Sequence, residues 1–141
     1  MRKDEQLYRQ KVNDLMKVYR EVAPDCWRQN QALCEVVKHP APRFYVLPHT
    51  AYCAIAKVLK GQQPGIKHKR KNDQRMFNEI LRRVSVKSSM PEYQGWPLIS
   101  ICEETVMEPA PEFYTEPCSL RTIIAMERKR IRNNIAKKLK E

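Results

Sequence analysis

A constant offset of 69 residues relates the two halves of this sequence, and it constrains the fold more than any other feature. The segment KHPAPRFYVLP (residues 38–48) recurs as MEPAPEFYTEP (residues 107–117), with six residues unchanged. At the same offset and without a gap, Trp27 aligns with Trp96. A segment repeated at one fixed spacing indicates an internal duplication. The sequence therefore predicts two tandem units, residues 1–69 and residues 70–141.

Each unit carries the pattern of three helices. Apolar residues at steps of three and four predict its first helix, and Asn72 and Asp73 are the expected caps of that helix in the second unit. The second helix is expected to stop at the first proline of the repeated segment, because proline lacks an amide hydrogen and disfavours helix before it. The residues of the first helix are Leu7, Tyr8, Val12, Leu15, Tyr19 and Val22 in one unit, and Met76, Phe77, Ile80, Leu81 and Val84 in the other.

The repeated sequence PAPxFY, here called the box, occupies residues 40–45 and 109–114. It is predicted to be extended, with its Phe-Tyr pairs as core anchors, and the matched tryptophans Trp27 and Trp96 are also expected to be packed. Pro48 and Pro117 are placed to begin the third helices. The first of these is expected to end at Leu59. The second is expected to continue to the C terminus through Leu120, Ile124, Ile131, Ile135 and Leu139.

The predicted fold class is all-α: a tandem duplication of a three-helix, helix-turn-helix-like unit with a long basic C-terminal helix. Three short helices in roughly 60–70 residues is how helix-turn-helix and homeodomain-like modules are built. The link between the second and third helices, residues 39–47, is longer than the turn of a true helix-turn-helix motif. Three-helix units also serve as protein-binding modules, so fold alone does not fix the function.

Charge indicates an acidic partner, with nucleic acid as the first choice. The chain has 27 Lys and Arg against 16 Asp and Glu, which gives a net charge of +11. The excess lies in the first unit, in the KHKRK run at residues 67–71, and in residues 127–141, which hold seven bases and two acids. Residues 71–126 hold six bases and eight acids and are net negative.

These cations predict a surface that follows phosphates, with Arg121 as the candidate for a guanine edge. DNA is favoured over RNA, and an RNA-binding accessory protein stays an alternative. The candidate nucleic-acid-binding residues are Arg43, Lys57, Lys60, Lys67, Lys69, Arg70, Lys71, Arg121, Arg128, Lys129, Arg130, Arg132, Lys137 and Lys138.

Other function classes find little support in the sequence. No nucleotide-binding glycine loop, HExxH or GxSxG motif is present, so a non-enzymatic protein without a cofactor is expected. The five cysteines are irregularly spaced and predict reduced thiols in the cytoplasm and no metal site. No apolar run approaches the roughly 20 residues of a membrane span, and the charged N terminus does not suit a secretory signal.

A second hypothesis is an interaction or assembly protein, for example a structural or accessory component of a phage or mobile element. Its basic faces would meet acidic protein, and its two units would provide two docking surfaces. Acidic residues at 103, 104, 108, 112 and 116 could dock against the basic tail of another copy, which makes a homo-oligomer possible.

The box and its flanking helices, VVKHPAPRFYVLPHTAYCAIA at residues 36–56, resemble a small family of basic helical proteins of bacterial genomes and mobile elements. Residues 105–125 carry the same resemblance less fully. That family has no established activity, so the resemblance implies a prokaryotic, phage or mobile-element setting and assigns no catalytic residue.

Overall fold

The computed structural model describes residues 3–61 and 70–140, and in these ranges the chain is all-helical. Short 3-10 turns (η1, Ala23–Asp25; η3, Pro91–Tyr93) link the first two helices of each half. The α-helices are α1 (Lys3–Val22), α2 (Gln29–Lys38), α3 (Pro48–Leu59), α4 (Lys71–Ser88), α5 (Leu98–Val106) and α6 (Pro117–Lys140).

Proline sets several helix boundaries, as the sequence predicts. Helices α3 and α6 begin at Pro48 and Pro117, where a missing amide hydrogen costs nothing. Helix α2 ends at Lys38, shortly before the prolines of the first box. The expected caps of α4 were wrong. That helix already begins at Lys71, and Arg70 at its N-cap makes no side-chain capping hydrogen bond.

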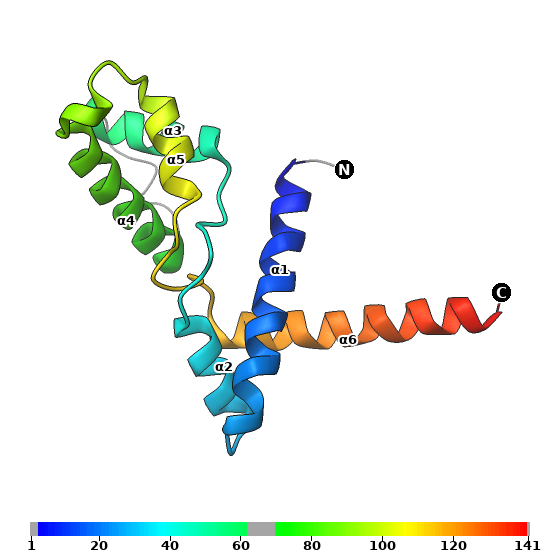
Figure 1. The fold of residues 1–141 in the computed structure, drawn as a ribbon. Coiled ribbons are helices and arrows are strands. Elements are labelled where there is room, and N and C mark those ends of the chain that lie inside the picture. Colours follow the sequence, from blue (N-terminus) through cyan, green and yellow to red (C-terminus); the bar gives the residue numbers. More distant parts are fainter. Residues whose placement is uncertain (1–2, 62–69, 141) are drawn as a thin grey trace.

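The helices form two groups that do not follow chain order. In the first, called the α1 group, α1 and α2 pack together and α6 packs against both. In the second, called the α4 group, α4, α5 and α3 pack together. Figure 1 shows the two groups joined by two extended segments, with α6 on the side of α1 and α3 on the side of α4. The third helix of each half of the chain therefore packs with the first two helices of the other half.

The two boxes cross between the groups and bond to each other reciprocally. Ala41 and Ala110 each donate their amide N–H to the other's carbonyl oxygen, at N···O distances of 3.0 and 2.9 Å. The Phe44 N–H donates to the Val106 carbonyl at the end of α5, while the Phe113 N–H donates to the Val37 carbonyl at the end of α2. Each bond thus has a counterpart 69 residues further along the chain.

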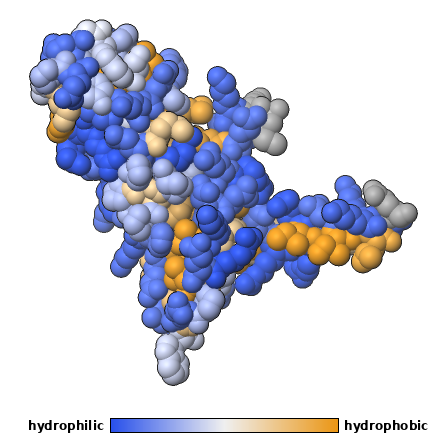
Figure 2. Space-filling model, viewed as in Figure 1, coloured by the Kyte–Doolittle hydropathy of each residue, from blue (hydrophilic) through white to orange (hydrophobic). Residues whose placement is uncertain are grey.

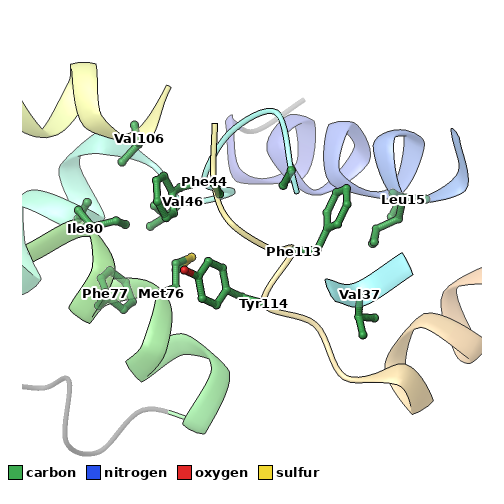
Figure 3. Close-up of a cluster of buried hydrophobic side chains, with 14 of the residues drawn as sticks. Leu15, Val37, Phe44, Val46, Met76, Phe77, Ile80, Val106, Phe113 and Tyr114 are labelled. Carbon is green, nitrogen blue, oxygen red and sulfur yellow. The ribbon is translucent and has the colours of Figure 1, made fainter. Parts of the chain in front are cut away.

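The box aromatics form the centre of the core, as predicted. Phe44 and Phe113 are each only 1% exposed. Figure 3 shows Phe113 beside Leu15 of α1, and Phe44 on the opposite side of the crossing near Val46. The ring of Phe44 stacks on that of Tyr114 at a centroid distance of 6.2 Å, and Tyr45 stacks on Phe113 at 5.9 Å. Stacked rings of this kind add to the free energy gained from burying their area.

Two expectations about local packing differ from the structure. Consecutive helices α2 and α3 lie in different groups, whereas a helix-turn-helix motif requires two consecutive helices in contact. Trp27 was expected to be packed, but it is 96% exposed. It lies in the turn before α2, which begins only at Gln29, so no helix face holds it in the core. Trp96 is partly exposed and contacts the edge of Tyr93.

Candidate nucleic-acid interface

The C-terminal half of α6 projects from the α1 group, as Figure 1 shows. Residues 128–140, here called the α6 tail, are all exposed. At a rise of about 1.5 Å per residue, a helical segment of this length spans roughly 20 Å. The predicted long basic C-terminal helix is therefore present, and half of it stands clear of the remaining helices.

The α6 tail carries cations and no acids. Its basic residues are Arg128, Lys129, Arg130, Arg132, Lys137, Lys138 and Lys140. Within the part of the chain that the structure describes, Arg130 is the one tail cation in an ion pair, with Glu127. The other six side chains face solvent with uncompensated charge, which attracts polyanions.

Glu127 anchors the start of the tail. This carboxylate is buried, accepts a hydrogen bond from Arg130 Nε at 2.9 Å, and is also ion-paired with Arg9 of α1. Burial acts to raise the pKa of Glu127, but the bonds from Arg9 and Arg130 outweigh it and hold this pKa below its ordinary value of 4.5. The tail is thus tied to α1 at the point where it leaves the core.

The ion pairs of Glu127 with Arg9 and Arg130 predict an acid-sensitive contribution to the stability of the fold. Because the pKa of Glu127 is lowered by folding, its contribution is complete above the unfolded value near 4.5 and is lost as pH falls through the folded pKa. Replacing Glu127 with Gln should lower the free energy of unfolding at pH 7 by about 1 kcal/mol, because solvent around the two half-exposed arginines screens the pair.

Urea unfolding of wild type and Glu127→Gln at pH 7 and pH 3 checks this prediction. The difference in unfolding free energy between the two proteins should shrink at pH 3. A difference that stays constant with pH would show that ionisation of Glu127 does not stabilise the fold.

Arg121 is exposed and lies in the part of α6 that packs in the α1 group, seven residues before the tail begins. Its guanidinium donates a hydrogen bond to the amide oxygen of Asn30 at the start of α2. Arg121 and Arg128 are seven residues apart, so they share one side of the helix. Arg121 thereby extends the cationic surface of the tail back towards α2.

Arg70 and Lys71 lie elsewhere, at the start of α4. They line a cleft of about 570 Å³, to which α1 contributes Lys11 and α6 contributes Ser119. Burial lowers the pKa of Lys11, and the nearby charge of Asp73 opposes this effect. Asp73 and Glu116 also line the cleft, so its wall carries both signs of charge.

The remaining predicted residues are not gathered at the tail. Arg43 is part-buried in the first box, where its Nε donates to the Phe44 carbonyl at 3.0 Å. Lys57 and Lys60 are exposed at the end of α3 in the α4 group, away from the tail in Figure 1. Lys67 and Lys69 lie outside the described residues. The structure therefore brings together Arg121 and the tail cations, and separates them from Arg43, Lys57 and Lys60.

No family model, no curated protein and no solved structure matches the chain. The resemblance carried by the box therefore stays a prediction. Within residues 3–61 and 70–140, no three His, Cys, Asp or Glu side chains are placed to hold a metal ion. Over the same ranges, no helix has the length and apolar character needed to cross a bilayer. Evidence on function therefore comes from the charge and apolar character of the described surfaces.

The structure also exposes three of the apolar residues that the sequence analysis named along the C-terminal helix. Ile131, Ile135 and Leu139 are 41%, 53% and 82% exposed. Figure 2 shows a hydrophobic band along the projecting helix, the part of α6 in which these residues lie. They are here called the apolar stripe. Helical periodicity finds the stripe in the sequence, but only the packing shows that α6 runs beyond its contacts with α1 and α2 and leaves the stripe uncovered.

Proposed function

We propose that this protein is a non-enzymatic nucleic-acid-binding protein that contacts the phosphates of duplex DNA through the α6 tail. The observation that carries the proposal is the run of seven cations on a projecting helix with no acid among them. A helix that stands clear of the core can approach a groove or a backbone without steric conflict. Arg121, at the root of the same helix, would add a contact to phosphate or to a base edge.

Counterion release supplies the driving force for such binding. Each phosphate that a Lys or Arg neutralises releases condensed cations from the DNA, which makes affinity fall steeply with salt. Asp73 and Glu116 line the cleft at Arg70 and Lys71, and their negative charge would oppose an approaching phosphate. The tail, which has no acids, is therefore the stronger candidate. A cytoplasmic location, expected from the reduced cysteines, belongs to the same proposal.

Fluorescence anisotropy across a salt series tests the proposed function. The full chain is titrated onto labelled duplex DNA, single-stranded DNA and RNA. Each contacted duplex phosphate should contribute about −0.9 to the slope of log affinity against log salt, so full engagement of seven cations gives a slope near −6. If the chain binds none of the three probes at about 50 mM salt, where electrostatic association is strong, the proposal is rejected.

An assembly protein is the second candidate function, and one observation favours it specifically. The apolar stripe is suited to protein contact, because phosphate binding has no use for exposed isoleucine and leucine side chains. The separation of Lys57 and Lys60 from the tail points the same way, since a single polyanion gathers cations on one face. Binding to an acidic protein without measurable affinity for nucleic acid would favour this candidate.

We also infer that the chain is a tandem duplication whose units, residues 1–69 and 70–141, have exchanged their third helices. The reciprocal bonds of the two boxes support this inference, because Ala41 with Ala110 and the Phe44 and Phe113 amides repeat at the offset seen in the sequence. Each unit then supplies two helices to one group and the third helix to the other.

A further inference from the structure

The apolar stripe is not a scattered set of exposed residues. Isolated surface hydrophobics are common and need no explanation. Here Ile131, Ile135 and Leu139 follow one another at four-residue steps on one side of a projecting helix, and their exposure rises outward from 41% to 82%. A helix whose apolar residues gather on one side is suited to packing against another surface.

The stripe continues an interface that already exists in the molecule. Leu120 and Ile124 are buried where α6 packs in the α1 group. Ile131 and Ile135 follow Ile124 at steps of seven and four, so they lie on the same side of the helix. Glu127 and its arginines mark the end of the covered part. Beyond them, the same packing face extends into solvent.

The cations of the tail lie mostly away from the stripe. At 100° per residue, Lys129, Arg130, Lys137 and Lys140 lie more than 90° away from the middle of the stripe, at Ile135. Arg132 and Lys138 border the stripe, and Arg128 lies in line with it, just before Ile131. The opposite side can therefore face phosphates while the stripe remains free for a second contact. The two contacts do not compete for the same surface.

We infer that the apolar stripe is covered by the same stripe of a second copy of this chain when both copies are bound side by side on nucleic acid. The inference rests on the proposed function. Three side chains per copy are far fewer than the 20–30 residues a side of a standard interface. The seven cations of each tail would also repel those of the other. Free molecules are therefore expected to stay apart.

Nucleic acid removes both obstacles to this pairing. Its phosphates neutralise the cations that oppose the approach of two tails. Adjacent sites on one strand also raise the effective concentration of one copy at the other, which makes a small contact sufficient. A partner without such tethering would need a larger surface than the stripe provides. The expected consequence is cooperative binding by copies that are monomeric when free.

A comparison of two duplex lengths tests the inference with the full chain. A short duplex has room for one copy, and a long duplex has room for several. The test variant carries Ile131→Ser and Ile135→Ser, which preserve every charge. The matched control carries Met107→Ser and Met126→Ser, which remove two exposed apolar side chains outside the stripe. Anisotropy and mobility shift report affinity and cooperativity.

Wild type and control should bind the long duplex cooperatively, and the isoleucine variant should not. Its half-saturation concentration on the long duplex should rise about tenfold, while its affinity for the short duplex is unchanged. Non-cooperative binding by wild type, or cooperativity that survives in the isoleucine variant, would overturn the inference and leave the proposed function intact. Failure of wild type to bind the short duplex would instead overturn the proposed function.

Discussion

Replacing Phe44 with alanine is expected to lower the free energy of unfolding by about 3–5 kcal/mol. The ring is fully buried at the crossing of the two boxes, stacks on Tyr114 and lies under the guanidinium of Arg83 at 4.9 Å. Truncation leaves a cavity that the crossing backbone cannot close, because the bonds between Ala41 and Ala110 hold the two segments in place. Urea denaturation followed by circular dichroism measures the effect.

Two further variants make this prediction specific to the crossed arrangement. Phe113→Ala should cost about as much as Phe44→Ala, since Phe113 is equally buried and makes the reciprocal contact with Tyr45. Trp27→Ala removes a larger side chain but should change the unfolding free energy by less than about 0.5 kcal/mol, because Trp27 is almost wholly exposed. A loss at Trp27 as large as that at Phe44 would contradict the packing described above.

The helices and most of their boundaries follow from local sequence, although the start of α4 does not. Apolar periodicity locates the packed faces of α1 and α4, and proline accounts for the starts of α3 and α6. The burial of Phe44 and Phe113 also follows, because an extended apolar segment between helices must place its large side chains in a core. These features depend on residues close together in the chain.

The grouping of the helices could not be predicted in the same way. The two units have matching apolar patterns, so the third helix of either unit presents a similar face to either pair of partners. Ala51 and Ile55 of α3 occupy the positions of Leu120 and Ile124 of α6, and all four are buried. The sequence pattern is compatible with two arrangements. In one, each third helix packs with the first two helices of its own unit; in the other, it packs with those of the other unit. The crossing of the boxes, a contact between distant segments, decides between them.

Two buried charges were also beyond sequence interpretation. At the 69-residue offset, Lys87 replaces Val18 and Glu127 replaces Val58, so periodicity alone places them at core positions without partners. The Lys87 ammonium donates to Thr105 Oγ1 at 3.2 Å and pairs with Glu108 at 2.9 Å. Both partners come from the segment around α5, whose position next to α4 is a property of the fold. A buried charge is tolerated only where such partners exist.

Neutralising three lysines of the α6 tail is expected to make nucleic-acid binding markedly less sensitive to salt. The variant Lys129→Gln, Lys137→Gln, Lys140→Gln removes cations from the side of α6 opposite the apolar stripe, and glutamine preserves length and helix propensity. If each lysine contacts one phosphate, the slope of log affinity against log salt becomes less steep by about three units. Anisotropy on a short duplex with room for one copy measures this slope without a contribution from cooperativity.

A second triple variant separates contact from net charge. Lys17→Gln, Lys57→Gln, Lys60→Gln makes the same change in charge at exposed positions on α1, on α3 and at the C-cap of α3. Since release of counterions depends on contacted phosphates, this variant should keep the wild-type slope. Equal reductions in both variants would mean that nucleic acid responds to the overall charge of the protein, and the α6 tail would then lose its place as the binding surface. A reduction confined to the second variant would transfer the interface to the surfaces that carry Lys17, Lys57 and Lys60.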